Sequence, residues 1–141
     1  MAIWFRNYTL EEVQQRGAGT MVEHIGIIIT EVGPDFLKGT MPVDHRNVQP
    51  MQILHGGASV AFAETLGSIA ANLVVDSEKK YCVGLDINAN HIRAAKKRLV
   101  TGVAKPLHLG FSTQVWSIEI TDVENRLVCI SRLTMAVLDM K

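Results

Sequence analysis

One long run of small residues, from about Gly57 to Val75, constrains the fold more than any other feature of the sequence. Small side chains recur along its whole length: Ala58, Ser59, Ala61, Ala63, Gly67, Ser68, Ala70 and Ala71. They fall on several faces of a helix, whereas a surface helix shows one apolar stripe opposite a charged face. The run therefore predicts a long helix that other elements approach closely on more than one side and that lies buried in the domain.

The segments around this helix predict one short helix and a set of strands. Thr9 followed by Glu12 is a capping-box pattern, which opens a short helix ending near Arg16. Alternating or β-branched residues predict strands at 22–32, 36–43, 81–93, 98–104, 112–121 and 126–138. Turns are expected at 33–35 and 122–125, and we interpret residues 105–110 as a loop between strands.

This order of elements predicts an α+β domain, in which an antiparallel sheet wraps around one long central helix and a short helix lies near the N-terminus. The length of 141 residues predicts that residues 1–141 form a single domain. An open sheet leaves unpaired edges, and a second copy of the chain can cover one of them. A dimer is therefore the smallest expected unit.

The composition argues against several classes of partner. Fourteen basic and fourteen acidic residues cancel and form no long basic stripe, so nucleic acid is not an expected partner. The longest apolar stretch carries Glu64, which argues against a membrane span, and the N-terminus lacks the apolar core of a signal peptide. We expect a cytoplasmic protein with Cys82 and Cys129 as reduced core thiols. The five histidines lack metal-type spacing, so no metal site is expected.

Glu64, about two turns into the long helix, is the candidate catalytic group. A carboxylate held among apolar residues loses hydration and can act as a base. Ser68 lies one helical turn further on the same face, where its hydroxyl could orient Glu64 or a water molecule. The alternative is a structural glutamate, satisfied at a subunit interface by an arginine or a backbone amide.

His55, Gly56 and Gly57 mark the start of the same helix. The first amides of a helix lack internal partners and lie at the positive end of the helix dipole, so they favour an oxygen anion. The Gly56 N–H and the side-chain amide of Gln49 could hold the oxyanion that forms when an acyl carbonyl is attacked. The alternative is an ordinary loop-to-helix junction, with His55 as a structural histidine.

A second polar cluster lies at the end of a predicted strand. It runs from Asn88 to Arg93 and continues with the basic residues at 96–98, so it could meet the phosphates of a nucleotide. The alternative is a solvated turn. The sequence holds no Gly-x-Ser-x-Gly elbow and no nucleotide-binding glycine motif, which removes serine hydrolases and dinucleotide-binding domains from the candidates.

From Leu54 to Glu64 the sequence resembles the hotdog-fold thioesterases of the 4-hydroxybenzoyl-CoA type. The resemblance spans nearly the whole chain and includes 41–44, 83–91, 105–110, 114–116 and 131–134. Within that family the chain is most similar to the bacterial 1,4-dihydroxy-2-naphthoyl-CoA thioesterases of menaquinone synthesis and to their broad-range relatives.

The resemblance implies a hotdog fold and the hydrolysis of an aromatic or bulky acyl-CoA to a free acid and CoA, without a cofactor. Glu64 would be the nucleophile or general base, and Ser68 would position the attacking water. Gln49 and the Gly56 amide would polarise the thioester carbonyl, with His55 assisting. The residues implied in holding CoA are Gly84, His91, Ile92, Arg93, Ala94, His108, Leu109, Gly110, Phe111, Ser112 and Thr113.

The resemblance further implies a homodimer with shared sites, in which one chain supplies Glu64 and its neighbour supplies Gln49 and Gly56. Two such dimers commonly pack back to back as a tetramer in this family. Candidate walls of the acyl pocket are Met51, Phe62 and Phe111. Two other functions stay open, namely an acyl-thioester dehydratase or hydratase that uses His55 with Glu64, and a non-catalytic acyl-CoA-binding protein.

Overall fold

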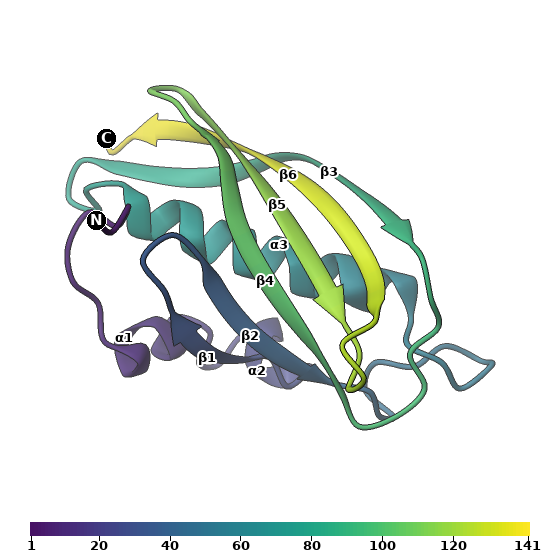
Figure 1. Ribbon diagram of the computed structural model, residues 1–141. Helices are drawn as coiled ribbons and strands as arrows, with labels where there is room; N and C mark the ends of the chain where they lie inside the picture. The colour runs from purple at the N-terminus through teal and green to yellow at the C-terminus, as the bar shows by residue number, and fades with distance from the viewer.

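The computed structural model describes residues 1–141 and shows a curved sheet folded around one long helix (Figure 1). The elements are α1 (Leu10–Gln15), α2 (Met21–His24), β1 (Ile28–Val32), β2 (Leu37–Pro42), α3 (Gly56–Val74), β3 (Lys80–His91), β4 (Leu99–Leu109), β5 (Thr113–Thr121) and β6 (Leu127–Asp139). All neighbouring strands are antiparallel, in the order β1-β2-β4-β5-β6-β3. The predicted α+β architecture is confirmed.

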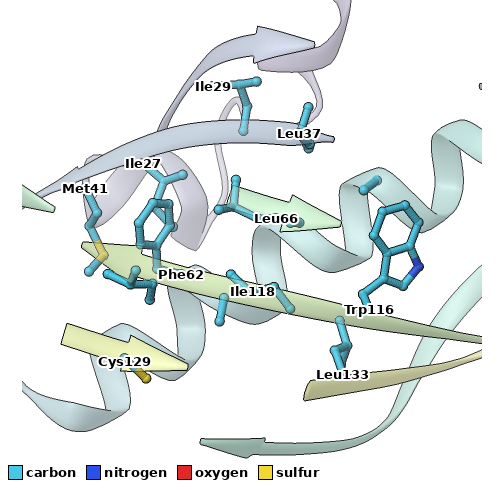
Figure 2. Close-up of a cluster of buried hydrophobic side chains, with 14 of the residues drawn as sticks. Ile27, Ile29, Leu37, Met41, Phe62, Leu66, Trp116, Ile118, Cys129 and Leu133 are labelled. Atoms are coloured by element: carbon cyan, nitrogen blue, oxygen red, sulfur yellow. The ribbon is translucent and has the colours of Figure 1, made fainter. Parts of the chain in front are cut away.

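The core lies between α3 and the concave face of the sheet, where Phe62 and Leu66 of the helix meet Trp116, Ile118 and Leu133 of the strands (Figure 2). Glycines on the strands let the helix come close. A β-carbon placed on Gly102 would lie 2.6 Å from Leu66 Cδ1 and 2.9 Å from Phe62 Cζ. Gly102 of the sheet thus makes room for two large side chains of the helix, while the small helix residue Gly67 makes room for Leu133, whose Cδ2 would lie 2.6 Å from an added β-carbon.

The prediction of a helix buried on more than one side is wrong for the single chain. The sheet covers one face of α3, while Glu64, Thr65 and Ser68 lie half-exposed on the other face. The sheet of one chain leaves part of the helix uncovered, and the short helix α2 contributes one wall beside the half-exposed face. By length and composition α3 could cross a membrane, but its apolar face is the packed core of the domain.

The strand predicted at 22–32 is also partly wrong, because Met21–His24 forms the helix α2 and only Ile28–Val32 is a strand. Thr20 caps this helix: its side-chain oxygen accepts a hydrogen bond from the Val22 N–H at 3.2 Å. Glu23 accepts from the Gly19 N–H at 2.6 Å. Gly26, with φ of +80°, turns the chain from the helix into β1. Local capping outweighed the β propensity of this segment.

Residues 105–109, interpreted from the sequence as a loop, instead continue β4. Pro106 is tolerated inside this strand because β2 pairs with β4 only as far as Ala104. Beyond that point one edge of β4 needs no N–H donor, and the other edge pairs with β5 at Trp116. The remaining strand and turn predictions agree with the structure to within a few residues. The capping box is present in both halves, Thr9 N–H to Glu12 Oε2 at 2.8 Å and Glu12 N–H to Thr9 Oγ1 at 3.2 Å.

Candidate active site

The start of α3 presents a free backbone donor. His55 is the N-cap residue, and its Nδ1 accepts a hydrogen bond from the Gly57 N–H at 2.8 Å. Because Nδ1 is an acceptor here, the ring proton of the neutral imidazole sits on Nε2, which is then a donor. The Gly56 N–H has no acceptor within the chain. The helix N-terminus thus offers a backbone N–H and an imidazole N–H to an incoming oxygen.

Gln49 lies on the loop before this helix, and its own hydrogen bonds leave the side-chain NH₂ group free. Its backbone N–H donates to the Ile53 carbonyl at 2.9 Å, and its carbonyl accepts from the Gln52 N–H at 2.8 Å. The side-chain oxygen of Gln49 accepts from the Met51 N–H, which fixes the orientation of the amide. A tight turn with Gln52 at φ of +62° makes this arrangement possible. The side-chain NH₂ group of Gln49 is therefore a free donor on an amide of fixed orientation.

Glu64 lies on the wall of a cavity of about 430 Å³ between α2 and α3. The lining residues are Met21, Val22, Ile25, Val60, Ala61, Glu64, Thr65, Ser68 and Ile69. Glu64 has no hydrogen bond or ion pair within the chain. A β-carbon on Gly84 would lie 3.5 Å from Glu64 Oε2, which places β3 directly beside the carboxylate. The cavity thus combines an unpaired carboxylate, a nearby hydroxyl and mostly apolar walls.

Gln49 and Gly56 line a second cavity of about 320 Å³, together with the predicted CoA residues His91, Ile92, Arg93 and Ala94. The His91 ring lies against the helix start, since a β-carbon on Gly56 would lie 3.0 Å from its Nε2 atom. An adjoining hollow of about 420 Å³ is lined by the basic residues Arg93, Lys96, Lys97 and Arg126, with Asp122 and Glu124 on its other side. The carbonyl-polarising candidates and one basic cluster are therefore neighbours.

A single chain does not bring all the predicted residues to one place. Glu64 follows Gly56 by eight residues on α3, which separates them by about 12 Å along the helix axis at 1.5 Å per residue. The segment 108–113 lies at the β4–β5 hairpin, at the opposite end of the sheet from His91 (Figure 1). There Lys80 lies 4.5 Å from the centre of the Phe111 ring. The candidate site is thus split into three parts within the chain.

The wall of the Glu64 cavity contains residues that sequence reasoning missed. Met21 and Val22 of α2 and its C-cap Ile25 line this cavity together with residues of α3, but the sequence predicted a strand from Val22 onward. The Thr20 cap followed by Glu23 is the signal that could have revealed the helix. The three expected pocket walls do not line this cavity: Phe62 is fully buried in the core, while Met51 is 77% and Phe111 84% exposed. No group of three histidine, cysteine, aspartate or glutamate side chains lies close enough to hold a metal ion.

A sheet wrapped around one helix, with an unpaired carboxylate over an apolar cavity and free N–H donors at the helix start, defines a hotdog-fold protein equipped for attack at an acyl carbonyl. Comparison with known proteins identifies the family. The model of the thioesterase superfamily matches residues 51–129. The chain belongs to this superfamily, and it is a thioester hydrolase.

Individual relatives agree with that assignment. The 1,4-dihydroxy-2-naphthoyl-CoA hydrolase of Escherichia coli is 53% identical over 136 residues, which cover 96% of this chain and 99% of that protein. The proofreading thioesterase EntH of Cronobacter sakazakii is 50% identical over 136 residues, covering 96% and 98%. A crystal structure of a Haemophilus influenzae thioesterase superposes with a TM-score of 0.94 at 48% identity, over 97% of this chain and 95% of that chain. The expected hotdog fold is confirmed.

Proposed function

We propose that this thioesterase hydrolyses acyl-CoA with an aromatic or bulky acyl group, giving a free acid and CoA, and that it uses no metal or redox cofactor. The observation that carries the proposal is the unpaired carboxylate of Glu64 on the wall of an apolar cavity. That cavity would take the acyl group, because six of its nine lining residues are hydrophobic. The substrates to test first are benzoyl-CoA and 1,4-dihydroxy-2-naphthoyl-CoA, the latter suggested by the name of the Escherichia coli relative.

The catalytic site is proposed to form between two chains, with Glu64 and Ser68 from one chain and Gln49, His55 and Gly56 from the other. The separation of about 12 Å along α3 supports this, since one thioester carbonyl cannot reach both groups in one chain. The edge strand β3 also supports it. This strand is twelve residues long, pairs only with β6 and exposes Val83 and Leu85. Long apolar edges invite strand pairing, so a second β3 would cover it. Two such dimers would pack as a tetramer.

The chemistry follows from the donors and the carboxylate. The Gly56 N–H and the Gln49 NH₂ group hold the thioester oxygen, while the N-terminal end of α3 favours the negative charge that develops on it. Glu64 either attacks the carbonyl carbon or takes a proton from a water that attacks it, with Ser68 orienting that water. The tetrahedral intermediate then collapses, the C–S bond breaks and CoA leaves as its thiolate, which gains a proton. In the anhydride route a water subsequently cleaves the bond between acyl group and Glu64.

The CoA portion is proposed to lie along the remaining predicted residues. Gly84 leaves room beside the thioester, and His91 to Ala94 border the cavity that holds Gln49. Arg93, Lys96 and Lys97 supply positive charge for the phosphates. His108 to Thr113 would come from another chain, because they lie at the far end of the sheet. A cytoplasmic location belongs to the same proposal and is supported by two free, buried cysteines.

Thiol release from benzoyl-CoA tests the assignment. Glu64→Gln keeps the shape and removes the negative charge, so kcat should fall at least about 100-fold, the usual effect of losing a catalytic base. Glu119→Gln, an equivalent change on an exposed position of β5, is the matched control and should retain full activity. Full activity of Glu64→Gln would contradict the proposal. An enoyl product with an intact thioester would indicate a dehydratase or hydratase, and binding of acyl-CoA without turnover would indicate a binding protein.

A further inference from the structure

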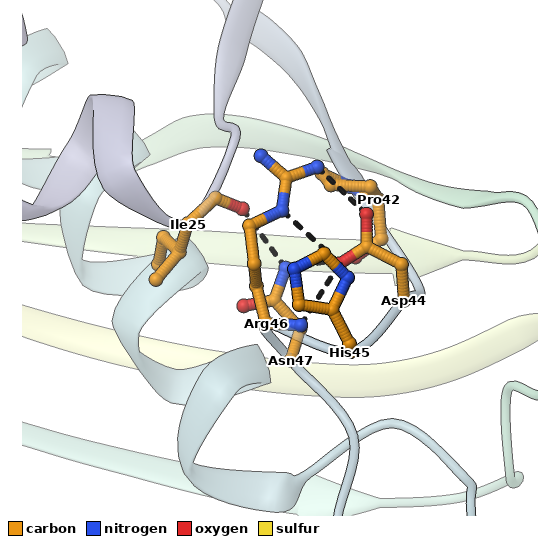
Figure 3. Close-up of polar contacts among 6 residues, drawn as sticks. All are labelled: Ile25, Pro42, Asp44, His45, Arg46 and Asn47. Atoms are coloured by element: carbon orange, nitrogen blue, oxygen red, sulfur yellow. Dashed lines mark hydrogen bonds and ion pairs between the residues drawn. The ribbon is translucent and has the colours of Figure 1, made fainter.

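Asn47 is a buried side chain that ties two distant segments together. Only 2% of its surface is exposed. Its Nδ2 group donates one hydrogen bond to the Ile25 carbonyl, at the end of α2, and another to the Pro42 carbonyl, at the end of β2, both at 2.9 Å. Figure 3 shows the amide lying between these two segments, beside the pair formed by Asp44 and Arg46. The side chain thus fixes the C-terminal end of α2 to the strand β2, which precedes the loop of residues 43–55 that carries Gln49 and His55 and is called the catalytic loop below.

The main chain of Asn47 reaches in the other direction, into the catalytic loop. Its N–H donates to the Asp44 carbonyl at 2.9 Å, and its carbonyl accepts from the His55 N–H at 2.8 Å. His55 directly precedes Gly56, whose N–H is the free donor of the site. A two-bond path therefore runs from Ile25, through Asn47, to the peptide next to that donor.

The helix α2, which the Asn47 side chain holds, needs stabilising contacts from outside itself. α2 has only four residues, and glycines in the left-handed region lie on either side of it, Gly19 at φ of +71° and Gly26 at φ of +80°. So short a helix gains little from its own hydrogen bonds. It nevertheless forms one wall of the cavity beside Glu64, through Met21, Val22 and Ile25.

The amide is retained at a cost. Asn47 Oδ1 is the one buried side-chain oxygen or nitrogen atom in the chain without a hydrogen-bond partner. An unpaired buried acceptor destabilises a fold, and an apolar side chain of similar size would avoid that penalty. What such a side chain could not supply is the pair of donated bonds to Ile25 and Pro42.

We infer that Asn47 is a positioning residue that fixes two segments of its own chain relative to each other. One is the α2 wall of the cavity beside its own Glu64, and the other is the catalytic loop, whose Gly56 serves the site of the neighbouring chain. The inference rests on the proposed function, since it takes the cavity beside Glu64 as the acyl pocket and Gly56 as a carbonyl donor. Asn47 itself touches neither reacting group. Its loss affects two separate kinetic quantities, one for each segment that it holds.

The test compares Asn47→Ala and Asn47→Asp with the parent protein. Asn47→Asp keeps the volume and an acceptor but, when ionised, has no donor. Both variants should lower kcat about tenfold for acetyl-CoA and benzoyl-CoA alike, because the loop no longer places the Gly56 N–H accurately. Both should raise KM about threefold or more for benzoyl-CoA only, because only the larger acyl group reaches α2. The link is overturned if only kcat changes or if only KM changes. It is also overturned if the KM for benzoyl-CoA rises no more than the KM for acetyl-CoA.

Trp4→Phe is the control for stability alone. It removes the hydrogen bond from Trp4 Nε1 to the Gly33 carbonyl at 2.7 Å and reduces the ring that stacks on Trp116, and Trp4 lines neither cavity. This variant should lower the melting temperature and leave kcat and the ratio of the two KM values unchanged. A matching kinetic loss in Trp4→Phe would mean that the Asn47 effects come from general destabilisation, which would also overturn the inference.

Amide hydrogen exchange provides a readout that does not depend on turnover. In Asn47→Ala the N–H groups of His55 and Ile27, one in the loop and one at the end of α2, should both exchange several-fold faster, and in Trp4→Phe neither should change. If only one of the two amides exchanges faster in Asn47→Ala, the inference fails even when the enzyme is active. If Glu64→Gln keeps full activity while both amides respond, the proposed catalytic role fails and the structural link stands.

Discussion

His55 caps a helix in this structure and is proposed to assist catalysis, and two substitutions distinguish these roles. Its Nδ1 caps α3 by accepting from the Gly57 N–H at 2.8 Å, and its Nε2–H is free to meet a substrate oxygen. His55→Ala removes both. Loss of an N-cap costs about 1 kcal/mol, and for a chain of this size that corresponds to a fall in Tm of roughly 2–4 °C. Loss of a donor to a developing oxyanion costs about 100- to 1,000-fold in kcat.

His55→Asn should restore one role and not the other. Asparagine is among the preferred N-cap residues, so its stability should lie within about 0.5 kcal/mol of the parent. Its shorter side chain uses its oxygen for the cap and does not place a donor where Nε2 lies, so kcat should stay as low as in His55→Ala. Thermal unfolding at one fixed protein concentration and steady-state thiol release from benzoyl-CoA measure the two quantities.

Two results would refute this reasoning. If His55→Asn hydrolyses benzoyl-CoA at the parental rate, the imidazole acts only as a helix cap. If His55→Ala unfolds at the parental temperature, the hydrogen bond to Gly57 contributes nothing to stability and the assignment of the proton to Nε2 loses its basis.

Three further outcomes are expected. The Gln14 side chain accepts a hydrogen bond from the Ile29 N–H and so blocks the exposed edge of β1. Gln14→Leu should therefore lower the free energy of unfolding by about 1–2 kcal/mol and cause concentration-dependent light scattering. Unchanged urea unfolding would contradict this. Burial raises the pKa of Cys82 to about 11, so its thiol should not react with an aromatic disulfide at neutral pH until the chain is unfolded, whereas rapid labelling of the native protein would show the thiol to be accessible. The side-chain hydrogen bond from Arg46 lowers the pKa of Asp44 to about 2 from 3.8, so its contribution to stability should be complete above about pH 4 and disappear as the pH falls through 2, and Asp44→Asn should abolish that dependence in urea unfolding.

The elements most easily predicted from the sequence are those whose signals are local. The long run of small residues gave α3 to within one residue at each end, and Thr9 with Glu12 gave α1, because capping and helical packing are encoded over a few neighbouring positions. Alternation gave β5, and the Asp122–Asn125 turn was visible in its residues. Where two local signals competed, the sequence misled. The β-branched residues around Ile25 predicted a strand, while the Thr20 cap made the segment a helix.

The sequence by itself determined the chemical groups of the site: a carboxylate in an apolar helix, glycines at the helix start, and a glutamine before them. Only the tertiary structure decided how they lie relative to one another. It left Glu64 unpaired on the half-exposed face of α3, set Gln49 and Gly56 in a different cavity, and made α2 the wall opposite the carboxylate. The buried position of Asn47 was likewise invisible, because its partners Ile25 and Pro42 are far away or carry no recognisable pattern. The sequence itself supplies the residue types. Segments that meet only after the sheet has closed around the helix decide which face of the helix is covered and which polar atoms find partners.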